Sequence, residues 1–214
     1  MHYDIAIIGY GPVGAMAANM FGSSGLNIVV IEPKKEIWNI PRAVALDGQA
    51  QRIFQSCGIS NNIPVKPIDG LTFINKKGQQ IVYVDFTDHS TPNGYSETVG
   101  FSQPNLERTL REQAESYKNI TFKLGSSLSN LVATENNNEL TVMNNVTNET
   151  EVISSKYLLA CDGADSFVRK KLSIPSFDYK CEQHWIVVDY ELDPKYEIQC
   201  SPHQICDYQR PTTL

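Results

Sequence analysis

The 214-residue chain has little of what marks a nucleic-acid-binding or membrane protein. Its 18 Lys and Arg are outnumbered by 24 Asp and Glu, so a formal net charge of −6 argues against a broad basic surface for nucleic acid. No apolar run approaches the roughly 20 residues that span a bilayer. The first residues, MHYDIAIIG, lack the basic head and cleavage site of a signal peptide. These absences favour a small-molecule enzyme or a protein with a protein partner.

Cysteine is scarce as well. The chain has 5 cysteines, an odd number without a dense spacing pattern, and this usage is typical of a reducing compartment. A cytoplasmic location is therefore expected.

Two groups of cysteine and histidine nevertheless have spacings found in zinc sites, which makes a metal-binding module an alternative. These groups are Cys181 with His184, and Cys200 with His203 and Cys206. If residues 181–188 form a strand, side chains three positions apart point to opposite faces. Cys181 and His184 would then not converge on one ion, so no metal site is predicted.

The most informative stretch is IIGYGPVGAMAA, residues 7–18, which contains a GxGxxG pattern. It follows a predicted buried strand at 3–8 and opens a predicted helix at 13–22, and a second strand is expected at 27–31. Gly9 permits the tight turn, Gly11 lets backbone N–H groups approach a diphosphate, and Gly14 lets the helix pack closely. The pattern predicts a dinucleotide-binding βαβ unit; glycines used only for packing are the alternative.

The start of the predicted helix suits an anion. Pro12 and Val13 occupy its first turn, where the missing N–H of a proline costs little and the helix dipole is positive. Glu32 follows the second strand, where a carboxylate can accept hydrogen bonds from a ribose hydroxyl pair. These residues suit NAD(P) and FAD equally, so they leave the identity of the dinucleotide open.

Further elements follow along the chain. Helices are expected at 47–57, 105–117 and 165–172, and LTFIN and IVYVDF flank a hairpin turn. Short extended runs between 120 and 160 predict an antiparallel meander, and 184–192 reads as one more strand. The predicted fold class is α/β: a Rossmann-like FAD/NAD(P)-binding domain with an antiparallel β meander and the start of a β-rich substrate domain.

The expected domain boundary lies near residue 175. Residues 1–175 would form the dinucleotide-binding domain, with a hairpin excursion at 71–96 toward the substrate side, and 176–214 would begin a substrate domain. The last residues, QICDYQRPTTL, contain no expected helix, cap or closing element. The chain is therefore expected to end within a domain.

Three more stretches carry a family resemblance: PRAVALDGQAQRIFQSCGI, FSQPNLERTLRE and YLLACDGADSFVRKKL. With the glycine loop, they resemble the aromatic-ring flavoprotein monooxygenases, a family that includes p-hydroxybenzoate hydroxylase and phenol hydroxylases. The resemblance implies FAD as cofactor, NADH or NADPH as reductant, and hydroxylation of a phenolic or aromatic acid with O2. In such enzymes the cofactor carries the chemistry, so no catalytic acid, base or nucleophile is predicted.

The resemblance also assigns binding roles. Arg42 would contact the phosphate and ribityl side of FAD, Gln103 the flavin side and Leu128 the adenine. Asp162 and Gly163 would bind near the diphosphate and ribose, with Arg169 supporting their loop and a role for it in nicotinamide recognition left open. Each role has an ordinary alternative: a solvated arginine, a helix-capping glutamine, or a simple Asp-Gly turn.

The resemblance further sets expectations for partners and activity. The expected partner is a small aromatic substrate, without nucleic acid or a membrane span, and a homo-oligomer stays open. Members of the family continue beyond this length, through the rest of the substrate sheet and a second Gly-Asp motif that holds the ribityl chain. A nucleotide-binding remnant without hydroxylase activity is therefore the alternative function.

Overall fold

The computed structural model describes residues 1–87, 91–188, 193, 195 and 202–214. The chain divides into two compact units, Met1–Pro67 with Thr91–Ile174, and Ile68–Ser90 with Pro175–Leu214. The assignment of one domain to FAD and the other to substrate stays a prediction, and each unit is described by itself below.

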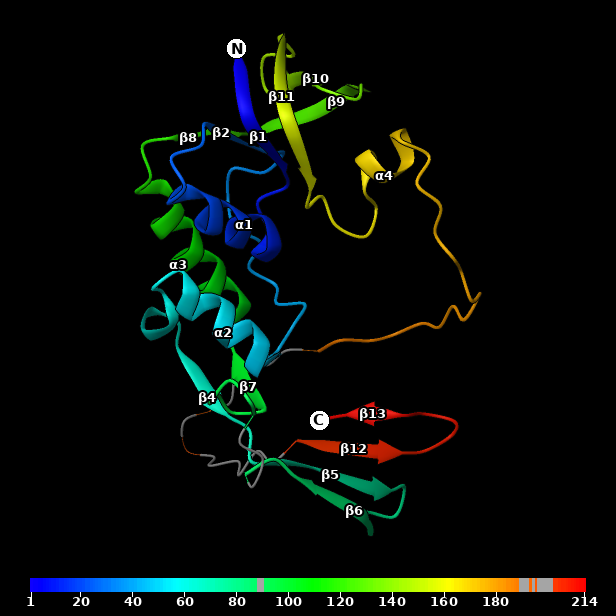
Figure 1. The fold of residues 1–214 in the computed structure, drawn as a ribbon. Helices are drawn as coiled ribbons and strands as arrows, with labels where there is room; N and C mark the ends of the chain where they lie inside the picture. The colour runs from blue at the N-terminus through cyan, green and yellow to red at the C-terminus, as the bar shows by residue number, and fades with distance from the viewer. Residues whose placement is uncertain (88–90, 189–192, 194, 196–201) are drawn as a thin grey trace. The chain divides into compact units, whose positions relative to one another are not determined.

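The first unit is built on a six-stranded sheet with the order β8-β2-β1-β11-β10-β9 (Figure 1). The strands β8, β2, β1 and β11 run parallel to one another, and β10 and β9 then alternate in direction after β11. This arrangement confirms the predicted α/β fold class. The bounds are β1 His2–Ile8, β2 Ile28–Glu32, β8 Ile120–Leu124, β9 Ser126–Ala133, β10 Asn138–Asn144 and β11 Thr150–Ala160.

The antiparallel meander predicted between 120 and 160 is confirmed for β9, β10 and β11, but the prediction is wrong in two respects. The run at 120–125 is β8, which pairs in parallel with β2 at the opposite edge of the sheet. It follows a helix, and a helical crossover returns the chain in the parallel direction. The runs at 150–155 and 157–161 form one strand, β11, which pairs antiparallel with β10 and then parallel with β1.

Two helices lie side by side against one face of β1 and β2 (Figure 1): α1, Pro12–Gly22, and α3, Gln103–Glu115. Successive strand residues point to opposite faces, so Ile5 and Ile7 pack with these helices while Ala6 and Ile8 pack on the other side. The Asn19 amide, 1% exposed, donates to the carbonyls of Ala15 and Leu110 at 2.8 Å each. This bridge fixes α1 to α3.

The opposite face is covered by the antiparallel strands of the same unit. Alternate residues of β1 and β2 pack there with side chains from β9, β10, β11 and the short helix α4, Phe167–Lys171, within the predicted helix 165–172. β1 and β2 are thus buried on both faces, which explains why they read as continuous apolar runs.

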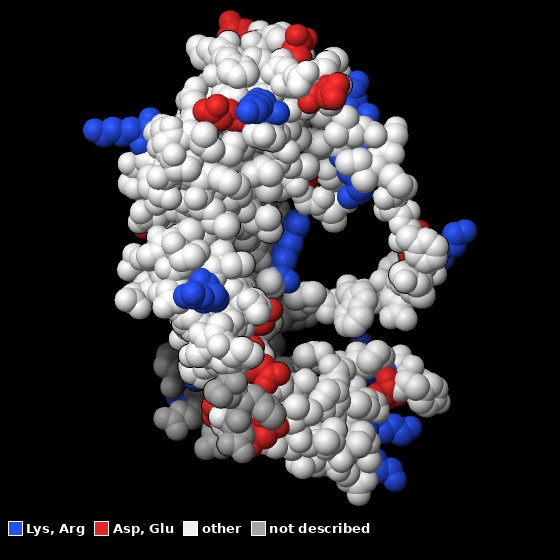
Figure 2. Space-filling model, viewed as in Figure 1, with Lys and Arg blue, Asp and Glu red and all other residues white. Residues whose placement is uncertain are grey.

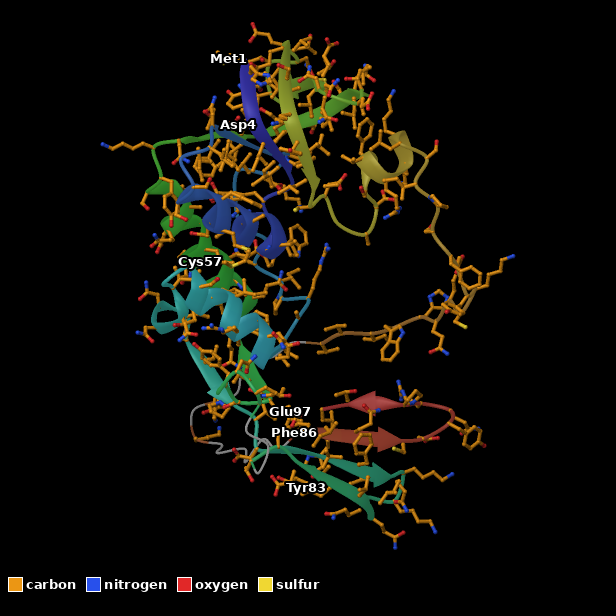
Figure 3. The ribbon with its side chains drawn as sticks, viewed as in Figure 1. Met1, Asp4, Cys57, Tyr83, Phe86 and Glu97 are labelled. Carbon is orange, nitrogen blue, oxygen red and sulfur yellow. The ribbon has the colours of Figure 1, made fainter. Side chains whose placement is uncertain are left out.

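The remaining elements of the first unit lie between α1 and α3 in sequence. Helix α2, Gly48–Ser56, is capped at its start by Asp47, whose side chain accepts a hydrogen bond from Ala50 N at 2.8 Å. Its C-cap residue is Cys57 (Figure 3). The short 3-10 helix η1, Ser60–Asn62, follows. A small antiparallel sheet has the order β3-β7-β4, with bounds Ala45–Asp47, Thr98–Phe101 and Val65–Pro67.

The second unit contains a four-stranded sheet with the order β13-β12-β5-β6. The predicted hairpin is confirmed as β5, Gly70–Asn75, and β6, Gln80–Asp85, which carries Tyr83 (Figure 3). The expectation that no element follows the last predicted strand is wrong, because β12, His203–Cys206, and β13, Thr212–Thr213, pair with each other and β12 pairs with β5.

The strand predicted at 184–192 is also wrong over its described part. Residues 184–188 form no regular secondary structure and are exposed, and 189–192 lie outside the described residues. A strand needs a neighbour for its backbone N–H and C=O groups, and no described strand pairs with this stretch. Apolar composition alone therefore did not make it a strand.

Two surface properties bear on the expected partners. Within the part of the chain that the structure describes, no helix is long and apolar enough to cross a membrane. On the face shown in Figure 2, Lys and Arg lie singly or in small groups among neutral and acidic side chains.

Candidate functional site

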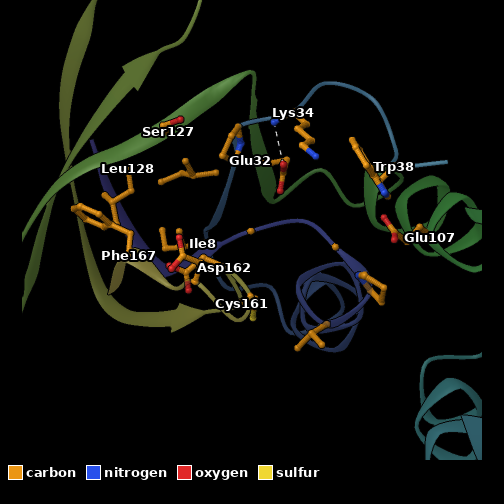
Figure 4. Close-up of a pocket in the computed structure, with 18 of the residues that line it drawn as sticks. Ile8, Glu32, Lys34, Trp38, Glu107, Ser127, Leu128, Cys161, Asp162 and Phe167 are labelled. Atoms are coloured by element: carbon orange, nitrogen blue, oxygen red, sulfur yellow. Dashed lines mark hydrogen bonds between the residues drawn. The ribbon is translucent and has the colours of Figure 1, made fainter. Parts of the chain in front are cut away.

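The carboxyl ends of β1, β2 and β11 open into one pocket of about 620 Å³, a size usual for small-molecule sites (Figure 4). Ligands of open parallel sheets bind at this edge. The pocket collects nearly all of the residues predicted from the sequence, namely Gly9, Gly11, Pro12, Val13, Glu32, Arg42, Gln103, Leu128, Asp162 and Gly163. Gly14 does not line it and packs behind the loop.

The three glycines of the loop meet different surroundings. Gly9 has φ +95°, and a Cβ there would come 2.7 Å from the backbone carbonyl carbon of Cys161. A Cβ on Gly14 would collide with the carbonyl oxygen of Gly9 and lie 2.9 Å from its carbon. A Cβ on Gly11 would meet no described atom within 4 Å. Gly9 and Gly14 therefore serve the fold, whereas Gly11 leaves open space beside the pocket.

The start of α1 faces this open space. Gly11 is the N-cap residue and Pro12 follows within the first turn. The N–H groups of a first helical turn have no partner within their helix, and the positive end of the helix dipole lies there. The pocket wall at Gly11 and Val13 is thus suited to an anionic group, as the sequence predicts.

Glu32 is held in place by backbone donors at the end of β2. Its Oε2 accepts from the Tyr10 N–H at 2.7 Å, and its Oε1 accepts from the Lys34 N–H at 2.9 Å (Figure 4). A carboxylate has about four lone-pair sites, so two remain for further donors such as a ribose hydroxyl pair. The Tyr10 contact also ties Glu32 directly to the glycine loop.

A cation and an aromatic ring stand beside Glu32 on the pocket wall. The Lys34 Nζ lies 3.9 Å from the centroid of the Trp38 ring, and both residues line the pocket. Sequence reasoning missed this pair, because the loop after β2 has no periodic pattern that would bring the two side chains together.

Gln103 does not have the helix-capping role proposed as its alternative. It is the first residue of α3 and is 7% exposed, and its Oε1 accepts from the Arg42 N–H at 2.7 Å and the Ala43 N–H at 3.0 Å. Its Nε2 donates to Glu107 Oε1 at 2.9 Å. Gln103 therefore holds the segment that carries the exposed Arg42, and the predicted contacts of both residues with FAD stay predictions.

The Asp-Gly turn after β11 is held by its own side chains. Asp162 Oδ1 accepts from the Ser166 hydroxyl at 2.6 Å, and Oδ2 accepts from the Val168 N–H at 3.1 Å. Gly163 has φ +82°, and Arg169 Nη2 donates to the Ala164 carbonyl at 2.8 Å. Asp162 thus builds a rigid turn at the pocket wall, and its predicted role toward the cofactor stays a prediction.

Two buried charged residues that line the pocket were missed. Glu107 and Arg111 on α3 are 3% and 7% exposed, and their nearest charged atoms, Oε2 and Nη2, are 3.8 Å apart. Their spacing in the sequence indicates an ion pair, because an acid and an arginine four positions apart on a helix lie on one face. Their burial is not indicated by the sequence, because charged residues of an amphipathic helix are expected on its solvent-exposed face.

The cysteine and histidine residues with zinc-like spacing do not come together in the part of the chain that the structure describes. Cys181 and His184 lie on an exposed stretch, and no group of three or more His, Cys, Asp or Glu side chains that could hold a metal is found among the residues described. Cys200 lies outside the described residues.

Cys161 provides a test of the pocket in solution. Burial raises the pKa of its thiol above the ordinary value, and the neighbouring Asp162 carboxylate raises it further. A higher pKa means less thiolate at neutral pH. We therefore expect iodoacetamide to alkylate Cys161 more slowly than the exposed Cys181 and Cys206 at pH 7, with a rate that rises with pH. Peptide mapping by mass spectrometry measures this, and equal rates at the three thiols would contradict the burial of Cys161.

A parallel sheet with a glycine loop, a helix start and an acid at the end of the second strand defines a dinucleotide-binding domain. The chain belongs to the family described as FAD binding domain, whose sequence profile matches residues 2–210. The family resemblance inferred from the motifs is thereby confirmed.

Two curated relatives that the chain resembles carry the same name. A 3-(3-hydroxy-phenyl)propionate/3-hydroxycinnamic acid hydroxylase from Escherichia coli O81 (strain ED1a) is 30% identical over 97% of this chain, which spans 37% of the relative. The hydroxylase of the same name from Paraburkholderia xenovorans (strain LB400) is 32% identical over 97% of the chain and 33% of the relative. The chain thus spans about a third of the length of these relatives.

Solved structures share the fold. The flavin-dependent monooxygenase PieE, solved with FAD and substrate, aligns with a TM-score of 0.72 and 21% identity over 81% of this chain and 32% of its own. The p-nitrophenol 4-monooxygenase PnpA from Pseudomonas putida DLL-E4 aligns with a TM-score of 0.74 and 20% identity over 80% of this chain and 44% of its own.

Proposed function

We propose that the pocket binds FAD, and that the chain is the FAD-binding part of a monooxygenase that hydroxylates a phenolic or aromatic acid with NADH or NADPH and O2. Family membership and the names of the curated relatives support this function. The single observation that carries it is the open side of Gly11 at the start of α1, flanked in the pocket by Glu32 and Asp162.

The residues present fit FAD. The first turn of α1 would hold the diphosphate, Glu32 the adenosine ribose, and Leu128 would lie beside the adenine, with Arg42 reaching the phosphate and ribityl side. Ile8, Leu128 and Phe167 give this pocket an apolar wall. FAD supplies the redox chemistry, and these residues bind and orient it.

The other expectations follow from the same proposal. The substrate is a small aromatic acid, the second unit belongs to a substrate domain, and the enzyme works in the cytoplasm without nucleic acid. Self-association is a further property to measure by sedimentation. A dinucleotide-binding protein without hydroxylase activity is the second candidate, because a dinucleotide-binding fold does not by itself fix the reaction.

The proposal is tested by titrating the purified chain with FAD and recording its absorbance and fluorescence. We expect saturable binding with a stoichiometry of one FAD per chain. A folded chain that does not bind FAD would overturn the proposal. Binding of FAD without NAD(P)H-dependent hydroxylation of phenolic acids would favour the second candidate.

Glu32 supplies a sharper test, because it would contact only the adenosine half of FAD. The variant Glu32→Gln is expected to bind FAD about tenfold more weakly, the loss of about one charge-assisted hydrogen bond. Affinity for FMN, which lacks the adenosine, should fall less, and any loss there reflects the one backbone hydrogen bond that the single oxygen of glutamine cannot keep. Fluorescence titration with both flavins measures this.

The matched control is Glu36→Gln, which removes a carboxylate from the same pocket wall. It should leave both affinities unchanged. An equal loss of FAD and FMN affinity in Glu32→Gln would show that Glu32 acts on the loop and not on the ribose.

A further inference from the structure

One face of α3 carries a row of three polar side chains, and the family resemblance assigns a role to only one of them, Gln103. Gln103, Glu107 and Arg111 are spaced four residues apart, so they follow one another along one side of the helix. All three are buried, at 7%, 3% and 7% exposure, and all three line the pocket. A buried row of this kind must have partners, and those partners show its role.

At one end, the row contacts the glycine loop. Arg111 Nη2 donates to the Tyr10 carbonyl at 2.8 Å, and the guanidinium carbon lies 4.5 Å from the centroid of the Tyr10 ring. Tyr10 stands between Gly9 and Gly11, and its N–H donates to Glu32. Arg111 therefore holds the residue at the centre of the loop.

At the other end, the row contacts the segment that carries Arg42. Gln103 accepts from the backbone N–H groups of Arg42 and Ala43, and it donates to Glu107. Glu107 lies between Gln103 and Arg111, so a continuous series of contacts joins two walls of the pocket that are far apart in sequence. No other described hydrogen bond reaches from a side chain to the backbone of Arg42.

The row is poorly built for stability alone. The separation of 3.8 Å between Glu107 and Arg111 exceeds a charge-assisted hydrogen bond, and Arg111 Nε has no hydrogen-bond partner among the described residues. Buried ion pairs often contribute little to stability, because desolvation offsets their attraction. A positioning role accounts for the row better than a purely stabilising one.

We propose that Gln103, Glu107 and Arg111 form a positioning relay, which holds the glycine loop and the Arg42 segment at the spacing needed to grip the diphosphate of a dinucleotide from two sides. The inference rests on the proposed function for its ligand. The relay itself exists without ligand, so it can be tested in the unliganded chain.

The first test measures amide hydrogen exchange at Arg42 and Ala43 in the unliganded chain. In Arg111→Met, these two amides should exchange about tenfold faster. Without Arg111, Glu107 is no longer held in the position from which it orients Gln103, and Gln103 is the side chain that accepts from both amides. Glu107→Gln, which keeps the side-chain volume, should act in the same direction. Arg108→Met and Glu112→Gln change exposed residues of the same helix and should have no effect.

Unchanged exchange at Arg42 and Ala43 in both folded relay variants would overturn the proposal. Circular dichroism establishes that each variant is folded. If Arg111→Met does not fold, Glu107→Gln and Arg111→Lys decide the matter, and the lysine should recover part of the protection because it retains the charge.

The second test is a double-mutant cycle on FAD affinity. Gln103→Leu and Arg111→Met should each weaken binding about tenfold, and the double variant by about tenfold and not a hundredfold, because either change interrupts the same relay. A hundredfold loss of FAD affinity in the double variant would show that the two residues act independently, and it would overturn the relay. If the parent chain binds no FAD, the proposed function fails, while the exchange experiment still decides whether the relay exists.

Discussion

Replacing Gly11 by valine is expected to weaken FAD binding at least a hundredfold, a loss of about 2.8 kcal/mol, while changing the free energy of unfolding by less than about 1 kcal/mol. A Cβ at this position meets no described atom within 4 Å, and the backbone angles, φ −70° and ψ −171°, suit any residue. The isopropyl group would instead fill the space through which a diphosphate approaches the first turn of α1.

The measurement combines fluorescence titration of FAD with denaturant unfolding of the parent and the variant. Gly11→Ala serves as a graded control, because its single methyl group should weaken FAD binding less than valine does. If the Gly11→Val chain binds FAD as tightly as the parent does, the diphosphate does not bind at this position. That result would leave the family and the fold unaffected, since neither depends on the space beside Gly11.

Replacing Gly14 by alanine is expected to destabilise the fold by about 2 to 3 kcal/mol. Alanine favours a helix over glycine by about 1 kcal/mol, so propensity alone predicts a gain in stability. The new methyl group, however, would collide with the carbonyl oxygen of Gly9. That atom belongs to the backbone of a turn held at φ +95°, so relief requires the loop to move away from the helix. The clash therefore outweighs the propensity.

Denaturant unfolding monitored by circular dichroism measures the loss for Gly14→Ala. The matched control is Gly22→Ala at the end of the same helix, where the new methyl group would meet the side chain of Tyr117. That ring is partly exposed and can move, so a smaller loss is expected. A Gly14→Ala chain as stable as the parent would show that α1 is packed less closely on the loop than the structure has it.

The local part of the site could be predicted from the sequence. The order of strand, glycine loop, helix and strand is encoded within residues 3–32, and each step depends on neighbours in the chain. The prediction therefore identified Gly9, Gly11, Gly14 and Glu32 with the correct surroundings. The α/β fold class followed from the same stretch.

The long-range part could not be predicted in the same way. Gln103 binds the backbone of a residue 61 positions away, and nothing near either residue in the sequence indicates that contact. The same holds for β8, whose place beside β2 depends on the crossover through α3. Buried Glu107 and Arg111 show a related limit, because charge predicts exposure and only their partners in space explain their burial.

The dual pairing of β11 has a consequence for how the protein is made. The first strand of the chain, β1, obtains its second neighbour only when residues 154–160 have been synthesised. Contacts of such sequence separation form late, since closing a long loop costs entropy before the contact is gained. Gly9 packs against the backbone of Cys161, just after β11. The loop that opens the sequence is therefore among the last parts of its unit to reach its final shape as the polypeptide leaves the ribosome.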